Sequence, residues 1–133
     1  MTDLPFIRPE NPLSESRLAL VTTGGVHLLE QERFDIDLAA GDCSYREIPG
    51  GAYALTWTHA YYAPNHGTDL DSVFPLWTLR KLVAEGVVGE LNRRHFSFMG
   101  AIHDTSPLAE RTAPEVAGRL AEDGVDVVLL TPS

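Results

Sequence analysis

Four short apolar runs, each ended by glycine or polar residues, constrain the fold of this chain more than any other feature. They are RLALVTTGG (17–25), YALTWTHA (53–60), RHFSFMGAIHD (94–104) and VDVVLLTPS (125–133). Each run has the length and the apolar character of a buried β-strand. Apolar strands of this kind are typical of a parallel sheet that is covered on both faces.

A helical pattern precedes the third run. In residues 69–91, Asp71 or Ser72 is placed to cap a helix, Pro75 fits the first turn, and Gly86 fits the position after the last turn. The residues expected on its buried face are Leu76, Leu79, Leu82 and Val83. The pattern therefore predicts one helix between the second and third strands.

A second helical pattern, residues 112–124, leads directly into the last run. Thr112 is the expected cap, Pro114 fits the first turn, and Gly124 ends the helix. Strands that alternate with helices predict an α/β fold: three layers, Rossmann-like, with a mostly parallel sheet of about four core strands and helices on both faces. The segment GDCSYREIPG (41–50) interrupts this order and is interpreted as an extra edge strand or an ordered loop.

Length and composition indicate one globular domain. The chain has 133 residues, of which 44% are hydrophobic and 22% charged, so it has enough apolar surface for a single core. Residues 1–16, with Pro5, Pro9 and Pro12, are expected to form an irregular arm. Residues 17–133 are expected to form the α/β domain, and truncation at its C-terminus is one hypothesis for this domain.

Charge and cysteine content narrow the location and the partners. The net charge of −9 argues against binding to nucleic acid, which favours basic surfaces. Cys43 is the single cysteine, so no intramolecular disulfide can form and the cytoplasm is the expected compartment. No segment has the roughly 18 apolar residues that a membrane span requires.

Polar residues follow each apolar run, where an open α/β sheet usually binds its ligand. If the strands are parallel, these residues meet at one edge of the sheet and form a candidate site for a substrate. The candidates for substrate binding are Thr22, Thr23, Gly24, Gly25, His27, His59, His103 and Thr131.

Two interpretations of the TTGG sequence (22–25) stay open. Its backbone N–H groups can bind a carboxylate or phosphate, or the glycines can simply make a tight turn after the strand.

A metal site is a further, less favoured hypothesis, built on His59, His66, Asp69 and Asp71. Their spacing matches no common zinc pattern, and aspartates before a helix are more simply explained as capping residues.

Cys43 and the pair Arg93 and Arg94 each allow a structural and a chemical interpretation. Cys43 can act as a nucleophile, but no CxxC partner or flanking histidine accompanies it, so a small buried residue is the favoured interpretation. Arg93 and Arg94 are interpreted as an exposed helix end, with contact to an acidic group as the alternative.

Several segments, in order, resemble one protein family. They are LALVTTGGVHL, GDCSYREIP, THAYY, DLDSVFPLWTLRKLVAEGVVGEL, HFSFMG and EDGVDVVLLTPS. This succession resembles the selenoprotein B family of glycine, sarcosine and betaine reductases and their D-proline reductase relatives. The resemblance extends over residues 17–133.

The resemblance implies reductive cleavage of a C–N bond next to a carboxylate. In such reductases a partner subunit carries a pyruvoyl group that forms a Schiff base with the amino acid. A selenocysteine, or a cysteine in some relatives, attacks the α-carbon and expels the amine. This subunit type supplies that nucleophile, and a soft nucleophile that is ionised at neutral pH suits such a step.

In the family the nucleophile follows the strand that corresponds to VDVVLLTPS, whereas this sequence ends at Ser133. Cys43 does not lie at the matching position. Either the recorded chain stops at a UGA codon that is read as selenocysteine, or it is a naturally short relative without the redox residue. We expect no cofactor in the chain itself, and we expect association with another copy or another subunit through Leu129 and Leu130.

Three functions therefore stand as hypotheses. The first is a subunit of an amino-acid reductase that lacks its redox nucleophile in this chain. The second is a non-catalytic subunit for small-carboxylate binding or for assembly, and the third is a metal-dependent hydrolase or lyase.

Overall fold

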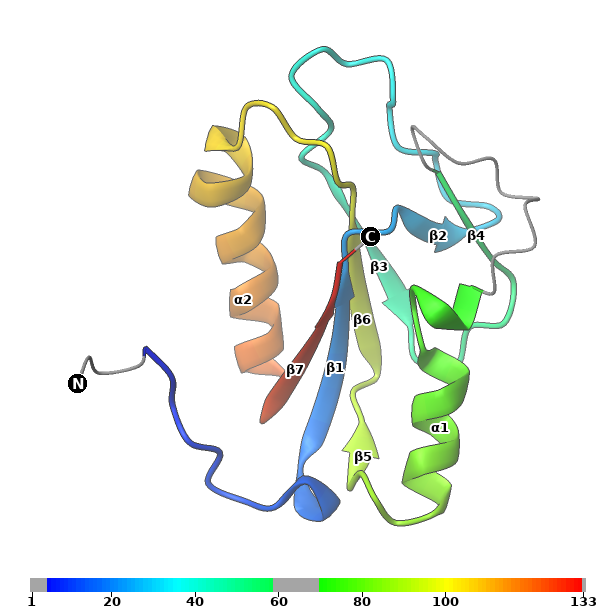
Figure 1. The fold of residues 1–133 in the computed structure, drawn as a ribbon, viewed down its shortest axis with the longest axis vertical. Helices are drawn as coiled ribbons and strands as arrows, with labels where there is room; N and C mark the ends of the chain where they lie inside the picture. The colour runs from blue at the N-terminus through cyan, green and yellow to red at the C-terminus, as the bar shows by residue number, and fades with distance from the viewer. Residues whose placement is uncertain (1–4, 59–69, 133) are drawn as a thin grey trace.

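The structure is a computed structural model that describes residues 5–58 and 70–132 (Figure 1). Its main sheet consists of β1 (Arg17–Thr22), β3 (Tyr45–Pro49), β5 (Glu90–Leu91), β6 (Arg94–Phe98) and β7 (Val127–Thr131). β5, β6 and β7 pair parallel with β1, and β3 pairs antiparallel with β6. The predicted α/β class with a mostly parallel sheet is therefore confirmed.

Two helices pack on the strands through separate apolar clusters (Figure 1). Leu18 and Leu20 of β1 belong to the cluster that contains Leu76 and Leu79 of α1 (Leu76–Ala84). Ala19, which points to the opposite face of the strand, belongs to the cluster of α2 (Ala113–Glu122). β1 is thus buried from both sides, which explains why its sequence is apolar at successive positions.

Each of the four apolar runs contains a strand, but the prediction that the second belongs to the main sheet is wrong. Within 53–60, only β4 (Leu55–Trp57) is a strand, and it pairs antiparallel with β2 (Val26–Leu28) in a separate two-stranded sheet. Leu55 and Thr56 are half-buried, and Trp57 and Thr58 are buried, so burial increases along β4 toward its carboxyl end. The predicted edge element at 41–50 forms β3, on the outer side of β6.

The first helix ends as its sequence indicates, but it begins at Leu76, so Pro75 precedes the first turn instead of lying in it. Asp71, in the 3₁₀ turn Leu70–Ser72, accepts hydrogen bonds from the backbone N–H groups of Trp77 (3.1 Å) and Thr78 (3.2 Å). These N–H groups lie in the first turn of α1 and have no partner within the helix. Gly86, with φ of +79°, follows the last turn.

The predicted cap of the second helix is wrong. Thr112 has helical dihedrals and makes no capping hydrogen bond, because a π-helical turn, Leu108–Thr112, continues directly into α2. Pro114 lacks the N–H that an α-helix uses at this position, and its ring crowds the carbonyl one turn earlier. The wider π turn accommodates both effects.

The N-terminal segment joins the domain just before β1. Residues 5–15 are exposed and contain one 3₁₀ turn, Leu13–Glu15, whereas Ser16 is buried. The Gly89 N–H donates to the carbonyl of Leu13 (3.0 Å), and a Cβ at Gly89 would lie 2.8 Å from backbone atoms of Glu15 and Ser16.

Across the described residues, no helix combines the length and the apolar character that crossing a membrane requires.

Candidate functional site

The carboxyl ends of β1, β6 and β7 lie side by side in the sheet. Thr22 is in register with Ser97 of β6 and with Thr131 of β7. We call Thr22–Gly25, Phe98 and Thr131 the rim. The rim therefore brings together residues that are more than 70 positions apart in the sequence, as the parallel arrangement predicts.

Thr22 is the central polar residue of the rim. It is fully buried, and its hydroxyl donates to the carbonyl of Thr131 (2.9 Å), with the carbonyl of Val73 at 3.3 Å. The same oxygen accepts a hydrogen bond from the N–H of Gly24 (3.0 Å). The hydrogen-bonding capacity of Thr22 is thus used within the protein.

The backbone N–H groups of the TTGG turn are also paired. Thr23 donates to Thr131 O (3.2 Å), Gly24 to the Thr22 hydroxyl, and Gly25 to Phe98 O (2.9 Å). Gly25 has φ of +66°, and a Cβ there would lie 2.1 Å from the carbonyl oxygen of Thr58. Turn geometry accounts for both the contacts and the glycine, and an anion would have to displace existing hydrogen bonds.

His27 lies behind the turn and is buried. With Nδ1 protonated, its ring donates to the carbonyl of Leu28 (2.7 Å) and accepts at Nε2 from the hydroxyl of Thr58 (3.0 Å). Thr58 in turn donates its N–H to Gly25 O (2.8 Å). His27 is therefore connected to the rim through Thr58.

Thr131 is the rim residue with unused hydrogen-bonding capacity. Its backbone carbonyl accepts from Thr22 and Thr23, but its Oγ1 is buried and has no partner in the described structure. Buried hydroxyls are normally paired, so this oxygen is a candidate for contact with a further group.

His103 and Cys43 lie beside the carboxyl end of β6, on the loop that follows it and on the loop that precedes β3. His103 is exposed, and its backbone N–H donates to Ala40 O (3.0 Å). The Cys43 thiol is half-buried and donates to Asp104 O (3.5 Å).

The metal candidates have different outcomes. Asp71 caps α1. His59, His66 and Asp69 lie outside the described residues. His59 is also a candidate for substrate binding, and the structure does not describe it in that role either. Within residues 5–58 and 70–132, no group of three or more His, Cys, Asp or Glu side chains is arranged to hold a metal ion.

Arg93 and Arg94 do not lie at a helix end, and the alternative interpretation, contact with an acidic group, is confirmed. Both bind Asp123 at the end of α2: Arg93 Nη2 lies 3.0 Å from Oδ1 and Arg94 Nε 2.7 Å from Oδ2. Asn92 Nδ2 donates to the same carboxylate (2.8 Å). The hydrogen bonds from Arg94, followed by those from Asn92 and Arg93, hold the pKa of Asp123 well below its usual range despite burial.

His95, within the predicted third strand, is a structural residue that the sequence alone did not single out. Its Nδ1 accepts the backbone N–H of Leu20 (2.9 Å), and its Nε2 is buried without a partner in the described part of the chain. Burial, and secondarily the charge of Arg80, lowers the pKa of His95 to about 4. The ring is thus neutral at pH 7 and substitutes for a backbone acceptor between β1 and β6.

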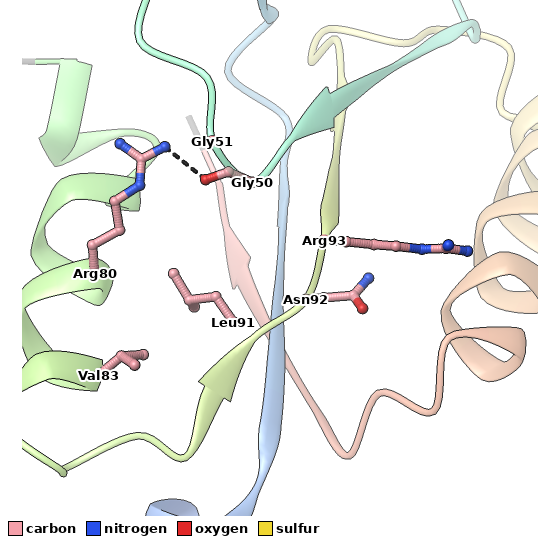
Figure 2. A pocket seen from close by; sticks show the side chains of 7 residues that line it. All are labelled: Gly50, Gly51, Arg80, Val83, Leu91, Asn92 and Arg93. Atoms are coloured by element: carbon pink, nitrogen blue, oxygen red, sulfur yellow. Dashed lines mark hydrogen bonds between the residues drawn. The ribbon is translucent and has the colours of Figure 1, made fainter.

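A cleft of about 450 Å³ opens at the other end of β6, next to α1 (Figure 2). Its lining consists of Gly50, Gly51, Arg80, Val83, Leu91, Asn92 and Arg93. Arg80 extends toward the turn after β3, whereas the side chains of Asn92 and Arg93 point away from α1 (Figure 2). This cleft is separate from the rim, because it lies before the first residue of β6 rather than after the last.

Comparisons with known proteins agree on one family. The family described as "Glycine/sarcosine/betaine reductase selenoprotein B (GRDB)" matches residues 1–133. The chain is 38% identical, over 122 residues, to D-proline reductase subunit gamma of Acetoanaerobium sticklandii, which covers 90% of this chain and 49% of that protein. No solved structure matches.

Two further relatives come from Peptoclostridium acidaminophilum. Glycine reductase complex component B subunit gamma is 33% identical over 128 residues, covering 90% of this chain and 28% of the relative. Betaine reductase complex component B subunit beta is 30% identical over 130 residues, covering 92% and 29%. The chain thus spans about half or less of the length of these relatives.

Proposed function

Because the chain belongs to the glycine/sarcosine/betaine reductase selenoprotein B family, we propose that it functions in a reductase complex that cleaves a C–N bond next to a carboxylate. The proposed substrates are small amino acids of the glycine, sarcosine, betaine and D-proline type. The observation that carries this proposal is the family match over all 133 residues, which include every rim residue. The three-layer, Rossmann-like description of the scaffold is part of the same proposal.

In this proposal the redox nucleophile is not among residues 1–133. Cys43 is the single cysteine, and its thiol proton is engaged by a backbone carbonyl. The reductive step breaks the C–N bond, forms a C–H bond and consumes two electrons. A dithiol donor supplies these electrons and becomes a disulfide. The selenolate or thiolate and the pyruvoyl group that the family implies would supply the bond-breaking chemistry from outside this segment.

In this proposal the rim positions the substrate and supplies no charged group. The hydroxyl of Thr131, which is unpaired in the described structure, is the group proposed to bind the substrate. Thr22, Thr23, Gly24 and Gly25 hold the carbonyl of Thr131 and the ends of the strands in place through their own hydrogen bonds. His27 supports the turn through Thr58, and His59 and His103 stay candidates for substrate contact.

The experiment is a substrate panel with the protein in its native complex and a dithiol as electron donor. Glycine, sarcosine, betaine and D-proline would release ammonia, methylamine, trimethylamine and a ring-opened primary amine, so the amine identifies the substrate. We expect turnover of one of them, with one disulfide formed per amine. Absence of turnover with all four would contradict the proposal.

An assembly role for the same chain is favoured by the exposure of β7. Its residues Val128 and Leu129 are each 38% exposed and Leu130 is 67% exposed, although β7 pairs with β1 along its full length. An apolar edge strand without a charged residue is a surface that another polypeptide usually covers. The relatives are named as subunits of reductases and complexes, so we propose that β7 faces another chain of such a complex.

A further inference from the structure

The cleft beside α1 has the features of a binding site that is distinct from the rim. It lies at the amino end of β6, and the four residue steps from Arg94 to Phe98 place it about 13 Å from the rim. Its volume of about 450 Å³ falls in the range of roughly 300–1,000 Å³ for small-molecule sites. The inference below goes beyond the proposed reductase function and does not depend on it.

The guanidinium of Arg80 is held in a fixed position at this cleft. Its Nη2 donates to the carbonyls of Gly50 (2.6 Å) and Ala52 (2.8 Å), the first of which is drawn in Figure 2. The aromatic rings of Tyr53 and Trp77 lie 4.7 and 5.5 Å from its Cζ. These contacts orient the cation but leave its charge without a carboxylate.

The remaining amino group of Arg80 lacks an acceptor. Nη1 is buried and has no hydrogen-bond partner in the described structure, and none of the ion pairs within 5–58 and 70–132 includes Arg80. Arg93, which lines the same cleft, is by contrast paired with Asp123 (3.0 Å). A buried donor without an acceptor is costly, so a preoriented, unpaired guanidinium points to an anionic ligand.

We propose that this cleft binds a small aliphatic carboxylate. The carboxylate would accept hydrogen bonds from Arg80, and the aliphatic part would contact Val83 and Leu91, whose side chains line the cleft between α1 and β5 (Figure 2). The ring of Tyr53 lies over the guanidinium and is 73% exposed, so this side of the proposed site is at the protein surface. A planar guanidinium matches a carboxylate better than a neutral amide of the same shape.

The test uses propionate as the probe and propionamide as its neutral analogue. Titration of the purified, ¹⁵N-labelled wild-type protein should shift the backbone amide signals of Gly50 and Gly51 in a saturable way with propionate. Propionamide should produce shifts at least tenfold weaker at the same concentration. An equal response to the two probes, or saturable shifts confined to Gly24 and Gly25 at the rim, would overturn the proposal.

Variants of Arg80 and of Arg93, whose side chain points away from α1, provide the comparison. Arg80→Gln should weaken propionate binding at least tenfold, whereas Arg93→Gln should change it less than twofold, because Arg93 is engaged by Asp123. Arg80→Lys retains the positive charge and loses the planar donor fork, so an intermediate loss is expected even if Arg80→Gln fails to fold. Equal losses in Arg80→Gln and Arg93→Gln would contradict the assignment.

Discussion

Polar groups at the two ends of the same parallel strands differ in charge and in how they are paired. At the carboxyl end, the rim is made of neutral groups, and Thr22, Gly24 and Gly25 pair with one another or with neighbouring strands. At the amino end, charged groups dominate: Asp123 binds Arg93 and Arg94, and Arg80 lacks an anionic partner in the described structure. Residue type alone therefore does not identify a binding group, because the same types are paired in one place and unpaired in another.

The same difference distinguishes groups that stabilise the fold from groups that are candidates for ligand binding. Buried, fully paired groups such as Asp123 and Thr22 hold elements together, and their removal leaves partners unsatisfied. Thr131 Oγ1 and Arg80 Nη1 are buried without a partner in the described structure, so they gain no hydrogen bond on folding and are the candidates for binding a ligand. Four predictions test this division, from the largest expected effect on stability to the smallest.

The largest effect is expected for Asp123→Ala. The substitution removes a carboxylate whose side chain is 1% exposed and leaves Asn92, Arg93 and Arg94 without their shared acceptor. We expect the free energy of unfolding to fall by about 3–5 kcal/mol, the usual cost of removing one partner from a buried ion pair. Urea denaturation at pH 7 measures this.

The neighbouring Glu122→Gln serves as the control. Its carboxylate is 77% exposed and lies 3.9 Å from Arg94, so the expected change is below about 0.5 kcal/mol. Similar losses for Asp123→Ala and Glu122→Gln would contradict a dominant role for the buried carboxylate.

The second prediction concerns pH. The pKa of His95 is about 4 in the folded protein and about 6.5 when unfolded, so the unfolded state binds more protons between these values. Stability should be full above pH 6.5 and should decrease by up to about 3 kcal/mol as the pH falls toward 4. Asp123 acts in a lower window, since its lowered pKa makes its contribution disappear only below the ordinary value of 3.8.

Denaturation curves between pH 4 and 7 measure this loss, and His95→Asn identifies its source. The amide oxygen of asparagine can replace Nδ1 as acceptor for the Leu20 N–H but does not titrate. The variant should therefore lose most of the pH dependence between 4 and 6.5. An unchanged slope would assign the effect to other groups.

The sequence predicted the elements whose signals are local. The apolar runs of β1, β6 and β7 and the end of α1 at Gly86 depend on burial and on backbone conformation, which a short segment encodes. The meeting of Thr22 with Thr131 could also be predicted, because parallel strands bring their carboxyl ends together.

Features that depend on tertiary pairing could not be predicted in this way. The apolar run 53–60 does not reveal that β4 leaves the main sheet, because its partner β2 is too short to be recognised. The choice of Asp123 as acceptor for Arg93 and Arg94, and the use of His95 as a backbone acceptor, depend on residues far away in the sequence. The sequence likewise gives no sign that Arg80 is oriented by carbonyls of the turn after β3.

The third prediction tests a paired group at the rim. Thr22→Val preserves the branched shape of the side chain and removes the hydroxyl that bonds Thr131 O and Gly24 N–H. The loss should be about 1–2 kcal/mol, because the Gly24 N–H is then buried without its acceptor. Thermal and urea denaturation measure it, and a change within error would show that the rim hydrogen bonds are not needed for folding.

The smallest effect on stability is expected for Thr131→Val, the matched change across the same pair of strands. Its Oγ1 is buried without a partner in the described structure, so replacing the hydroxyl by a methyl group removes an unsatisfied polar atom and costs less than about 0.5 kcal/mol. If Thr131 contacts the substrate, the same variant should lower kcat/KM about tenfold in the native complex, roughly the value of one hydrogen bond. A loss of stability as large as that of Thr22→Val, with kcat/KM unchanged, would mean that both threonines are structural and that the rim has no free hydroxyl.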